Sequence, residues 1–265
     1  MVREICFIQL CALVFCAERE GSFIMKIRIY KNAAQVGEAA ALLIAAQLIR
    51  KPDSVLGLAT GSSPIPAYQA LISMYQRGAV SFVQATSFNL DEYIGISEKH
   101  PCSYHCFMRE QLFDHVDMRP EAIHVPDGNA ENPQAFAAAY DWAIEKAGGI
   151  DLQLLGIGRN GHIGFNEPGD RFIRGCHVVD LAESTITANQ RFFESRDDVP
   201  RQAISLGVEA ILKAGTVVLI ATGKEKAQAV RDSIQGEITP QVQASILQGH
   251  PDAYWLLDED AASLL

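Results

Sequence analysis

The sequence lacks an excess of positive charge and, after Met25, any long hydrophobic run. Its 22 Lys and Arg residues are outnumbered by 32 Asp and Glu residues, giving a formal net charge of -10. This balance argues against extended contact with nucleic acid. No run after Met25 approaches the roughly 20 consecutive apolar residues that span a bilayer, so no membrane partner is expected there. An anionic ligand would therefore depend on local donors and cations.

Cysteines are also few, since six in 265 residues do not make a disulfide scaffold. Two of them, Cys102 and Cys106, lie close to His100 and His105, but the spacing fits no standard zinc finger. A helix with two cysteines four residues apart is the simpler explanation. We therefore expect no metal site.

Short apolar runs alternate with helical patterns through most of the chain, and 48% hydrophobic residues suffice for a large core. Such a rhythm predicts an α/β fold: a three-layer αβα sandwich with a mostly parallel sheet, of a modified Rossmann-like kind. The expected strands are residues 26–30, 55–59, 86–90, 152–155, 178–181, 216–221 and 254–257. The clearest expected helices are residues 33–49, 65–77, 133–147 and 225–234. Ligands of such folds bind at the carboxyl ends of the strands.

The first polar cluster, Thr60-Gly61-Ser62-Ser63-Pro64, follows the second apolar run and precedes a helical pattern. A helix N-terminus presents unpaired N–H groups and the positive end of its dipole, and a glycine lets an anion approach the backbone closely. Thr60, Gly61 and Ser62 are therefore candidates for a phosphate cradle. An ordinary capped loop is the alternative.

The second cluster, Asp91-Glu92-Tyr93, follows the strand expected at residues 86–90. Neighbouring side chains on an extended chain point to opposite sides, so Asp91 and Glu92 should not both face one ligand. One of them is a candidate base, while an exposed turn is the structural alternative.

The third cluster spans residues 156–168 and is dense in glycine and ionisable groups. Three of its glycines match the dinucleotide-binding pattern G-x-G-x-x-G, but Pro168 and Gly169 leave no room for the helix which that pattern requires. The better interpretation is an acid–base loop in which His162 titrates near neutral pH while Asn160 and Glu167 hold or polarise it.

These three clusters, in this order, resemble the glucosamine-6-phosphate deaminase family. The similarity rests on residues 60–64, on Phe88-Asn89-Leu90-Asp91-Glu92-Tyr93 and on residues 161–168, which read Gly-His-Ile-Gly-Phe-Asn-Glu-Pro. It covers the chain from Met25 to about Leu257. The resemblance implies a metal-free and cofactor-free conversion of glucosamine 6-phosphate and water into fructose 6-phosphate and ammonia.

The resemblance also implies a role for each residue. His162 would open the sugar ring, oriented by Asn160 and Glu167, and Asp91 would move a proton from C2 to C1. Thr60, Gly61 and Ser62 would hold the phosphate, with positive charge supplied by Arg191 and Lys226. Some members carry Asp where this chain has Asn160, which is expected to shift the pH profile without abolishing ring opening.

Two other functions are alternatives to this one. A 6-phosphogluconolactonase would share the fold and a similar histidine loop, but would need neither the Asp91 base nor the run Asn166-Glu167-Pro168. A sugar-phosphate sensor of a transcription regulator would carry a DNA-binding helix pair, and none fits before Met25. The expected partner is therefore a small amino-sugar phosphate, bound by a monomer or a homo-oligomer.

Residues 1–24 resemble either a secretory signal, with an apolar run after Arg3, or an upstream extension before Met25. The extension is favoured because a sugar phosphate is an intracellular substrate, which predicts a cytoplasmic protein. Residues 25–265 are then expected to form a single domain. Asp170, in the segment where some relatives bind an activator, would repel a phosphate, which predicts an unregulated enzyme.

Overall fold

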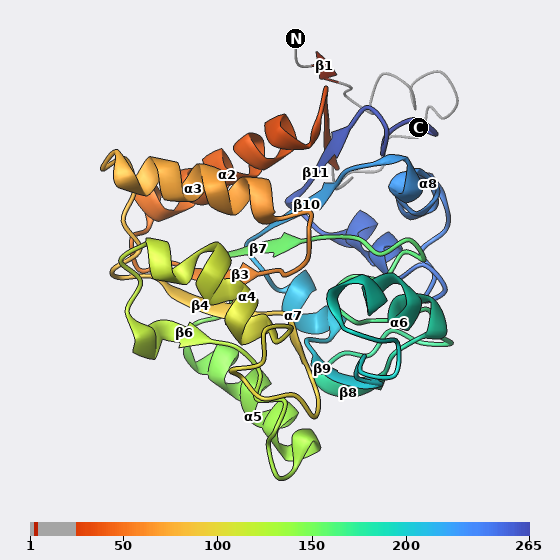
Figure 1. Ribbon diagram of the computed structural model, residues 1–265. Helices are drawn as coiled ribbons and strands as arrows, with labels where there is room; N and C mark the ends of the chain where they lie inside the picture. Colours follow the sequence, from red (N-terminus) through yellow and green to blue (C-terminus); the bar gives the residue numbers. More distant parts are fainter. Residues whose placement is uncertain (1–2, 5–24) are drawn as a thin grey trace.

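The computed structural model describes residues 3–4 and 25–265 (Figure 1). The expectation for residues 1–24 lies outside the described residues, apart from β1 (Arg3–Glu4), which pairs antiparallel with β2 (Lys26–Tyr30). That residues 25–265 form one domain stays a prediction.

A large sheet with the strand order β1-β2-β11-β10-β7-β3-β4-β6 runs through the molecule. Beyond β1, every neighbouring pair of its strands is parallel, which confirms the predicted α/β fold. The strands after β2 are β3 (Val55–Leu58), β4 (Thr86–Asn89), β6 (Ile123–His124), β7 (Leu152–Leu155), β10 (Thr216–Ala221) and β11 (Ala253–Asp258).

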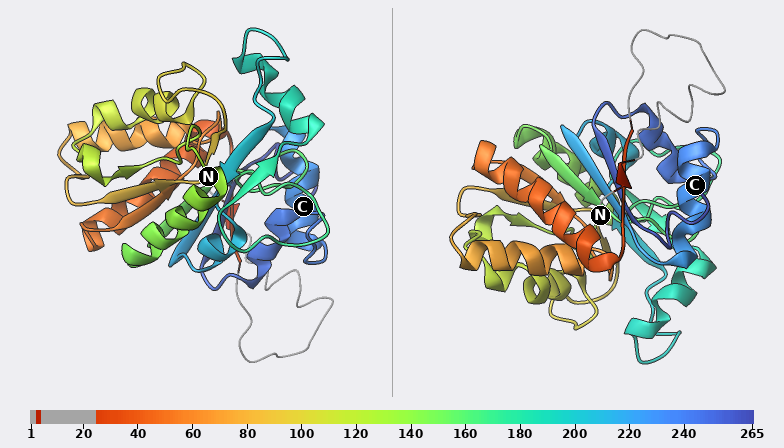
Figure 2. Two further views of the ribbon diagram at one scale, coloured as in Figure 1. Left: turned by 90° about the horizontal axis from the view of Figure 1, so that it is seen from below. Right: turned by 90° about the horizontal axis from the view of Figure 1, so that it is seen from above.

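Helices cover both faces of this sheet, so its central strands are buried on both sides. Figure 2 shows α2 (Ala33–Arg50) and α3 (Ile65–Gln76) on one face and α8 (Ala227–Gln235) on the other. Strands β3 and β7 are buried along their whole length, as expected of a parallel sheet between helices. The other helices are α4 (Tyr104–Gln111), α5 (Pro133–Lys146), α6 (Glu183–Asn189) and α7 (Val208–Leu212), with 3-10 turns η1 (Phe113–His115), η2 (Pro120–Ala122), η3 (Gln190–Phe192), η4 (Lys224–Lys226) and η5 (Gln243–Gly249).

Helix α2 is long and apolar enough to cross a membrane, by length and composition only. Here Val36, Ala40 and Ile44 on its inner face belong to the core beneath it. The apolar composition of α2 is thus accounted for by packing against the sheet and α3.

A second, antiparallel sheet has the strand order β5-β9-β8. It is formed by β5 (Asp91–Tyr93), β9 (Gln202–Ser205) and β8 (His177–Asp180). The strand predicted at residues 178–181 belongs here rather than to the parallel series. The pattern of one short apolar run carries no information on its partner, which is why its place was missed.

The order in which the chain adds strands to the large sheet reverses between β3 and β7, although these two strands are parallel. From β3 the chain continues outward to β4 and β6, then returns to β7 on the other side of β3 and continues to β10 and β11. This is the topological switch point at which open α/β sheets bind their ligands. The three polar clusters directly follow β3, β4 and β7, which are neighbours in the sheet.

Candidate active site

Asp91 is the first residue of β5, two positions after the end of β4. It is only 6% exposed, and none of the described residues donates a hydrogen bond to its carboxylate. Burial, and then the negative charge of neighbouring Glu92, raise the pKa of Asp91 to about 8. A carboxyl group with a pKa near neutrality can both accept and return a proton.

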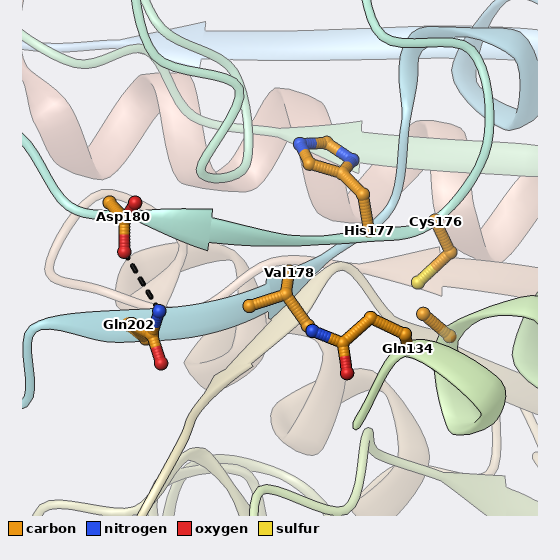
Figure 3. Close-up of a pocket in the computed structure, with 7 residues that line it drawn as sticks. Gln134, Cys176, His177, Val178, Asp180 and Gln202 are labelled. Carbon is orange, nitrogen blue, oxygen red and sulfur yellow. Dashed lines mark hydrogen bonds between the residues drawn. The ribbon is translucent and has the colours of Figure 1, made fainter. Parts of the chain in front are cut away.

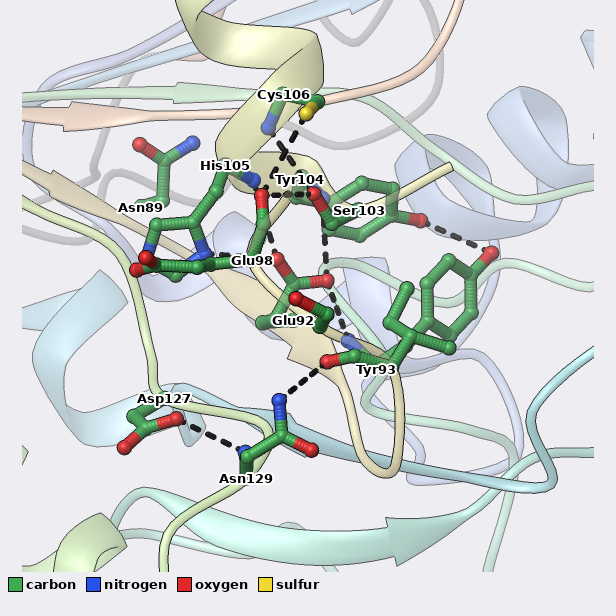
Figure 4. A network of polar contacts seen from close by, with 12 residues as sticks. Asn89, Glu92, Tyr93, Glu98, Ser103, Tyr104, His105, Cys106, Asp127 and Asn129 are labelled. Carbon is green, nitrogen blue, oxygen red and sulfur yellow. Dashed lines mark hydrogen bonds and ion pairs between the residues drawn. The ribbon is translucent and has the colours of Figure 1, made fainter. Parts of the chain in front are cut away.

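Glu92 has a different environment, although it is the next residue (Figure 4). Its carboxylate accepts hydrogen bonds from the backbone N–H groups of Tyr93, Tyr104 and His105, and His105 Nδ1 lies 3.0 Å from its Oε2. Two of these N–H groups belong to the first turn of α4, where a negative charge is stabilising. Glu92 therefore fixes α4 against β5, and the expected separation of the two acids is found.

The loop after β7 pairs His162 with Glu167. Nδ1 of His162 lies 3.2 Å from Oε2 of Glu167, and the Asn160 side-chain amide donates to the same oxygen at 2.7 Å. The backbone N–H of His162 donates to Oδ1 of Asn160. Burial of Glu167 is outweighed by its bonds with His162, Thr185 and Asn160 and by the attraction of His162, so the pKa of Glu167 lies below its usual value.

Glycines give this loop its shape. A side chain at Gly158 would begin 2.4 Å from Nε2 of His162, so the imidazole lies directly over a residue that has no Cβ. Gly161 and Gly164 adopt positive φ angles of 85° and 58°, which favour glycine. No helix forms in residues 156–176, all of them described, so the requirement of the dinucleotide fingerprint is not met.

The same loop approaches Asp91. The Cβ position of Gly164 lies 3.5 Å from Oδ2 of Asp91, and the ring of Phe165 packs on Tyr93 with 5.6 Å between centroids. Asp91 and His162, far apart in the sequence, are thus brought to one edge of the sheet.

The segment at residues 60–64 joins β3 to α3. Gly61 has a φ of 95°, and a Cβ there would meet no atom within 4 Å, so the backbone is open on that side. No side chain among the described residues caps the N-terminus of α3. The side chain of Thr60 lies close to the hydroxyl of Tyr104. These features suit an anion bound to backbone N–H groups.

Positive charge lies next to this edge. Lys226 follows β10, and its Nζ donates a 2.6 Å hydrogen bond to the carbonyl of Ile157 directly after β7. Burial chiefly lowers the pKa of Lys226, and the nearby charges of Arg159 and Arg191 lower it further, against the raising effect of Glu225. The Arg191 side chain is exposed and makes no ion pair with any described carboxylate. Three cations therefore lie near one another, and none of them forms an ion pair with a carboxylate in the part of the chain that the structure describes.

Three residues of this region were not predicted from the sequence. Arg159 adds a third cation, Tyr104 contacts Thr60, and Thr185 of α6 donates a 2.5 Å hydrogen bond to Oε1 of Glu167. Only the basic charge of Arg159 gave any signal, because the other contacts depend on the small sheet and on α6. Within the described part of the chain, no group of three or more His, Cys, Asp and Glu residues is placed to hold a metal ion.

A pocket of about 410 Å³ lies elsewhere, between α5 and β8 (Figure 3). None of the predicted site residues lines it. Its walls are formed by Gln134, Ala137, Cys176, His177, Val178, Asp180 and Gln202. The chemistry of the loops at the sheet edge, rather than the size of this hollow, marks the candidate active site.

Sequence comparison finds a matching family and similar proteins. Residues 30–255 match the family of glucosamine-6-phosphate isomerases/6-phosphogluconolactonase. A glucosamine-6-phosphate deaminase of Halothermothrix orenii is 51% identical over 241 residues, covering 91% of this chain and 100% of the relative. One from Clostridioides difficile is 48% identical over 241 residues, covering 91% of this chain and 97% of the relative.

Two solved structures of the same fold superpose on this chain. A monomeric glucosamine-6-phosphate deaminase superposes with a TM-score of 0.89 at 43% identity, covering 91% of this chain and 100% of its own. The 6-phosphogluconolactonase from Trypanosoma cruzi superposes with a TM-score of 0.75 at 19% identity, covering 94% of this chain and 99% of its own, and shows the shared fold alone.

Proposed function

This chain belongs to the family of glucosamine-6-phosphate isomerases/6-phosphogluconolactonase, and on that premise we propose that it is a glucosamine-6-phosphate deaminase. It converts glucosamine 6-phosphate and water into fructose 6-phosphate and ammonia. The observation that carries this proposal is the approach of the His162–Glu167 loop to the buried Asp91, whose carboxylate accepts no hydrogen bond from the described residues, at the switch point of the sheet. A lactonase requires no such base.

His162 opens the sugar ring by transferring a proton between the hydroxyl and the ring oxygen. Glu167 accepts from the imidazole on one side, and Gly158 leaves the Nε2 side free of a Cβ. Asn160 acts through Glu167 and through the His162 backbone rather than on the imidazole itself. General acid–base assistance of this kind contributes roughly 10²–10⁴ in rate.

Asp91 then takes the C2 proton of the open-chain sugar and returns it to C1. The enolamine formed by the first transfer becomes a ketimine after the second, and hydrolysis of the ketimine releases ammonia. Because the pKa of Asp91 is raised to about 8, its carboxylate is basic enough to take the C2 proton and its carboxylic acid is acidic enough to return the proton to C1 near neutral pH. One base thus serves both neighbouring carbons.

The phosphate is held by the open backbone at Thr60, Gly61 and Ser62, at the N-terminus of α3, which no side chain of the described residues caps. Arg191 supplies a fork of donors, and Lys226 supplies a point charge. The lowered pKa of Lys226 follows from burial among cations, and an arriving phosphate would offset that cost.

The chain acts as a cytoplasmic monomer with hyperbolic kinetics. The monomeric state of the 43% identical deaminase supports a monomer. Asp170, in the segment after the histidine loop, supports hyperbolic kinetics because it would repel a phosphorylated activator. Light scattering during size-exclusion chromatography should give the mass of one chain, and the rate curve should have a Hill coefficient near one. A rise in activity with N-acetylglucosamine 6-phosphate would contradict the absence of regulation.

Ammonia release from glucosamine 6-phosphate is the decisive measurement, with hydrolysis of 6-phosphogluconolactone assayed in parallel. Wild-type protein should release ammonia, whereas lactone hydrolysis alone would favour the other branch of the family. Asp91→Asn should still bind the sugar phosphate but lose solvent exchange at C2 by roughly 10²–10⁴ in rate. Asp53→Asn, at an exposed position, is the matched control. Retained exchange in Asp91→Asn would remove Asp91 from its role.

A further inference from the structure

Glu167 uses both of its carboxylate oxygens, and they face different parts of the chain. Oε2 meets His162 and Asn160 of its own loop, whereas Oε1 accepts from the Thr185 hydroxyl of α6 at 2.5 Å. The Glu167 side chain is 9% exposed and Thr185 is 5% exposed, so water has little access to either group. Without Thr185, Oε1 would have no donor among the described residues.

The helix that carries Thr185 is held at several points. Ile186 is 2% exposed and packs in a second apolar cluster with Tyr93 and Phe165. At the other end of α6, the side-chain amide of Asn189 donates a 2.9 Å hydrogen bond to the hydroxyl of Tyr93. The position of the Thr185 hydroxyl is therefore fixed by packing against β5 and against the histidine loop, not by the flexibility of a surface helix.

We propose that Thr185 is a positioning residue for His162. By occupying Oε1, the Thr185 hydroxyl prevents rotation of the Glu167 carboxylate, which keeps Oε2 directed at Nδ1 of His162. The imidazole is thereby kept over Gly158 with its other nitrogen available for the substrate. The kinetic part of this inference rests on the proposed function; the contacts of Glu167 with Thr185 and with His162 do not.

Helix α6 offers a matched set of variants. Thr185→Val keeps the shape of the side chain and removes the hydroxyl, while Thr185→Ser restores a hydroxyl at the same place. Thr187→Val is the control, because Thr187 donates only to the backbone carbonyl of Glu183 within the same helix and is exposed. All three changes leave the groups proposed to touch the substrate in place.

In ammonia-release assays, kcat of Thr185→Val should fall about tenfold while KM stays within about twofold, because the lost hydrogen bond is to Glu167, which is not one of the proposed phosphate-binding residues. Thr185→Ser should recover most of kcat, and Thr187→Val should match wild type. A rise in KM with kcat unchanged, or an equal loss in Thr185→Ser, would overturn the proposal.

A second measurement needs no substrate. The side-chain nitrogen resonances of His162, assigned by comparison with His162→Gln, report the hydrogen bond at Nδ1. They should move in Thr185→Val and stay in place in Thr187→Val. Unchanged resonances would refute positioning even in an active enzyme. If wild type released no ammonia, the deaminase proposal would fail, whereas this spectroscopic test would still decide the role of Thr185.

Discussion

Two carboxylates of the candidate site, Asp91 at the start of β5 and Glu167 at the end of the histidine loop, are both nearly buried but differ in hydrogen bonding. Glu167 is paired with His162, Asn160 and Thr185, and its pKa is lowered. Asp91 has no donor among the described residues, and its pKa is raised to about 8. The difference teaches that burial alone does not set the chemistry of an acid; the donors around it do.

Glu92 extends this comparison by one residue. It is 1% exposed, more deeply buried than Asp91, but three backbone N–H groups and His105 surround it. Such a carboxylate stays in place and stabilises α4. A buried acid left without donors is costly to the fold and is found where a reaction requires it.

The stability of Asp91→Asn tests this contrast most strongly. Because the folded pKa of about 8 exceeds the ordinary value of 3.8, ionisation of Asp91 opposes folding. That cost is absent below the ordinary value, grows as the pH rises towards about 8 and is constant above it. We expect Asp91→Asn to raise the free energy of unfolding at neutral pH by about 2–4 kcal/mol, with the buried amide offsetting part of the gain.

Urea unfolding at neutral pH and again near the ordinary carboxyl pKa would measure this effect, because the gain should disappear in acid. Asp53→Asn, at an exposed position, should change neither value. A variant that is less stable than wild type at neutral pH would mean that Asp91 has donors in the folded protein and that the contrast with Glu167 does not hold.

The pH dependence of the reaction gives a smaller effect on the same contrast. The base form of Asp91 is the ionised one, so kcat/KM should fall as the pH drops below about 8, approaching about tenfold per pH unit. Glu167, with its lowered pKa, stays ionised over that range. The ionisation of the substrate is titrated separately and subtracted. A flat profile between about pH 6 and about pH 8 would show that Asp91 titrates elsewhere.

Much of the arrangement could be predicted from local patterns. The runs that became β2, β7 and β10 match their predicted bounds. Strands β7 and β10 are nearly continuous in apolar residues because they are buried on both faces, whereas β2 alternates apolar and polar residues. Because α/β sheets bind ligands at the carboxyl ends of their strands, the sequence also predicts that Thr60, Asp91 and His162 lie at one end of the sheet. The proposed roles of these residues remain predictions.

Long-range pairing could not be predicted in the same way. Thr185 meets Glu167 only because α6 packs beside the antiparallel sheet, and the strand at residues 177–180 gave no sign of pairing with β9 rather than a parallel neighbour. Burial was equally hidden: an Asp-Glu pair in a sequence indicates exposure by default, yet both residues lie inside. Contacts between segments with no shared pattern need coordinates.

Asn160→Asp is expected to have the smallest effect and sharpens the contrast from the Glu167 side. The Asn160 amide donates to Oε2 of Glu167, so a carboxylate in its place removes one donor and adds a like charge beside that oxygen. Oδ1 can still accept from the backbone N–H of His162. A second negative charge favours the protonated imidazole, so the alkaline limb of kcat should move to higher pH while kcat at neutral pH changes by less than about tenfold.

Gln84→Glu, which adds the same charge at an exposed position, should leave the pH profile of kcat unchanged. A loss as large as that expected for Asp91→Asn would mean that the histidine loop depends on full pairing of Glu167, and that its donors are as indispensable as the base opposite them.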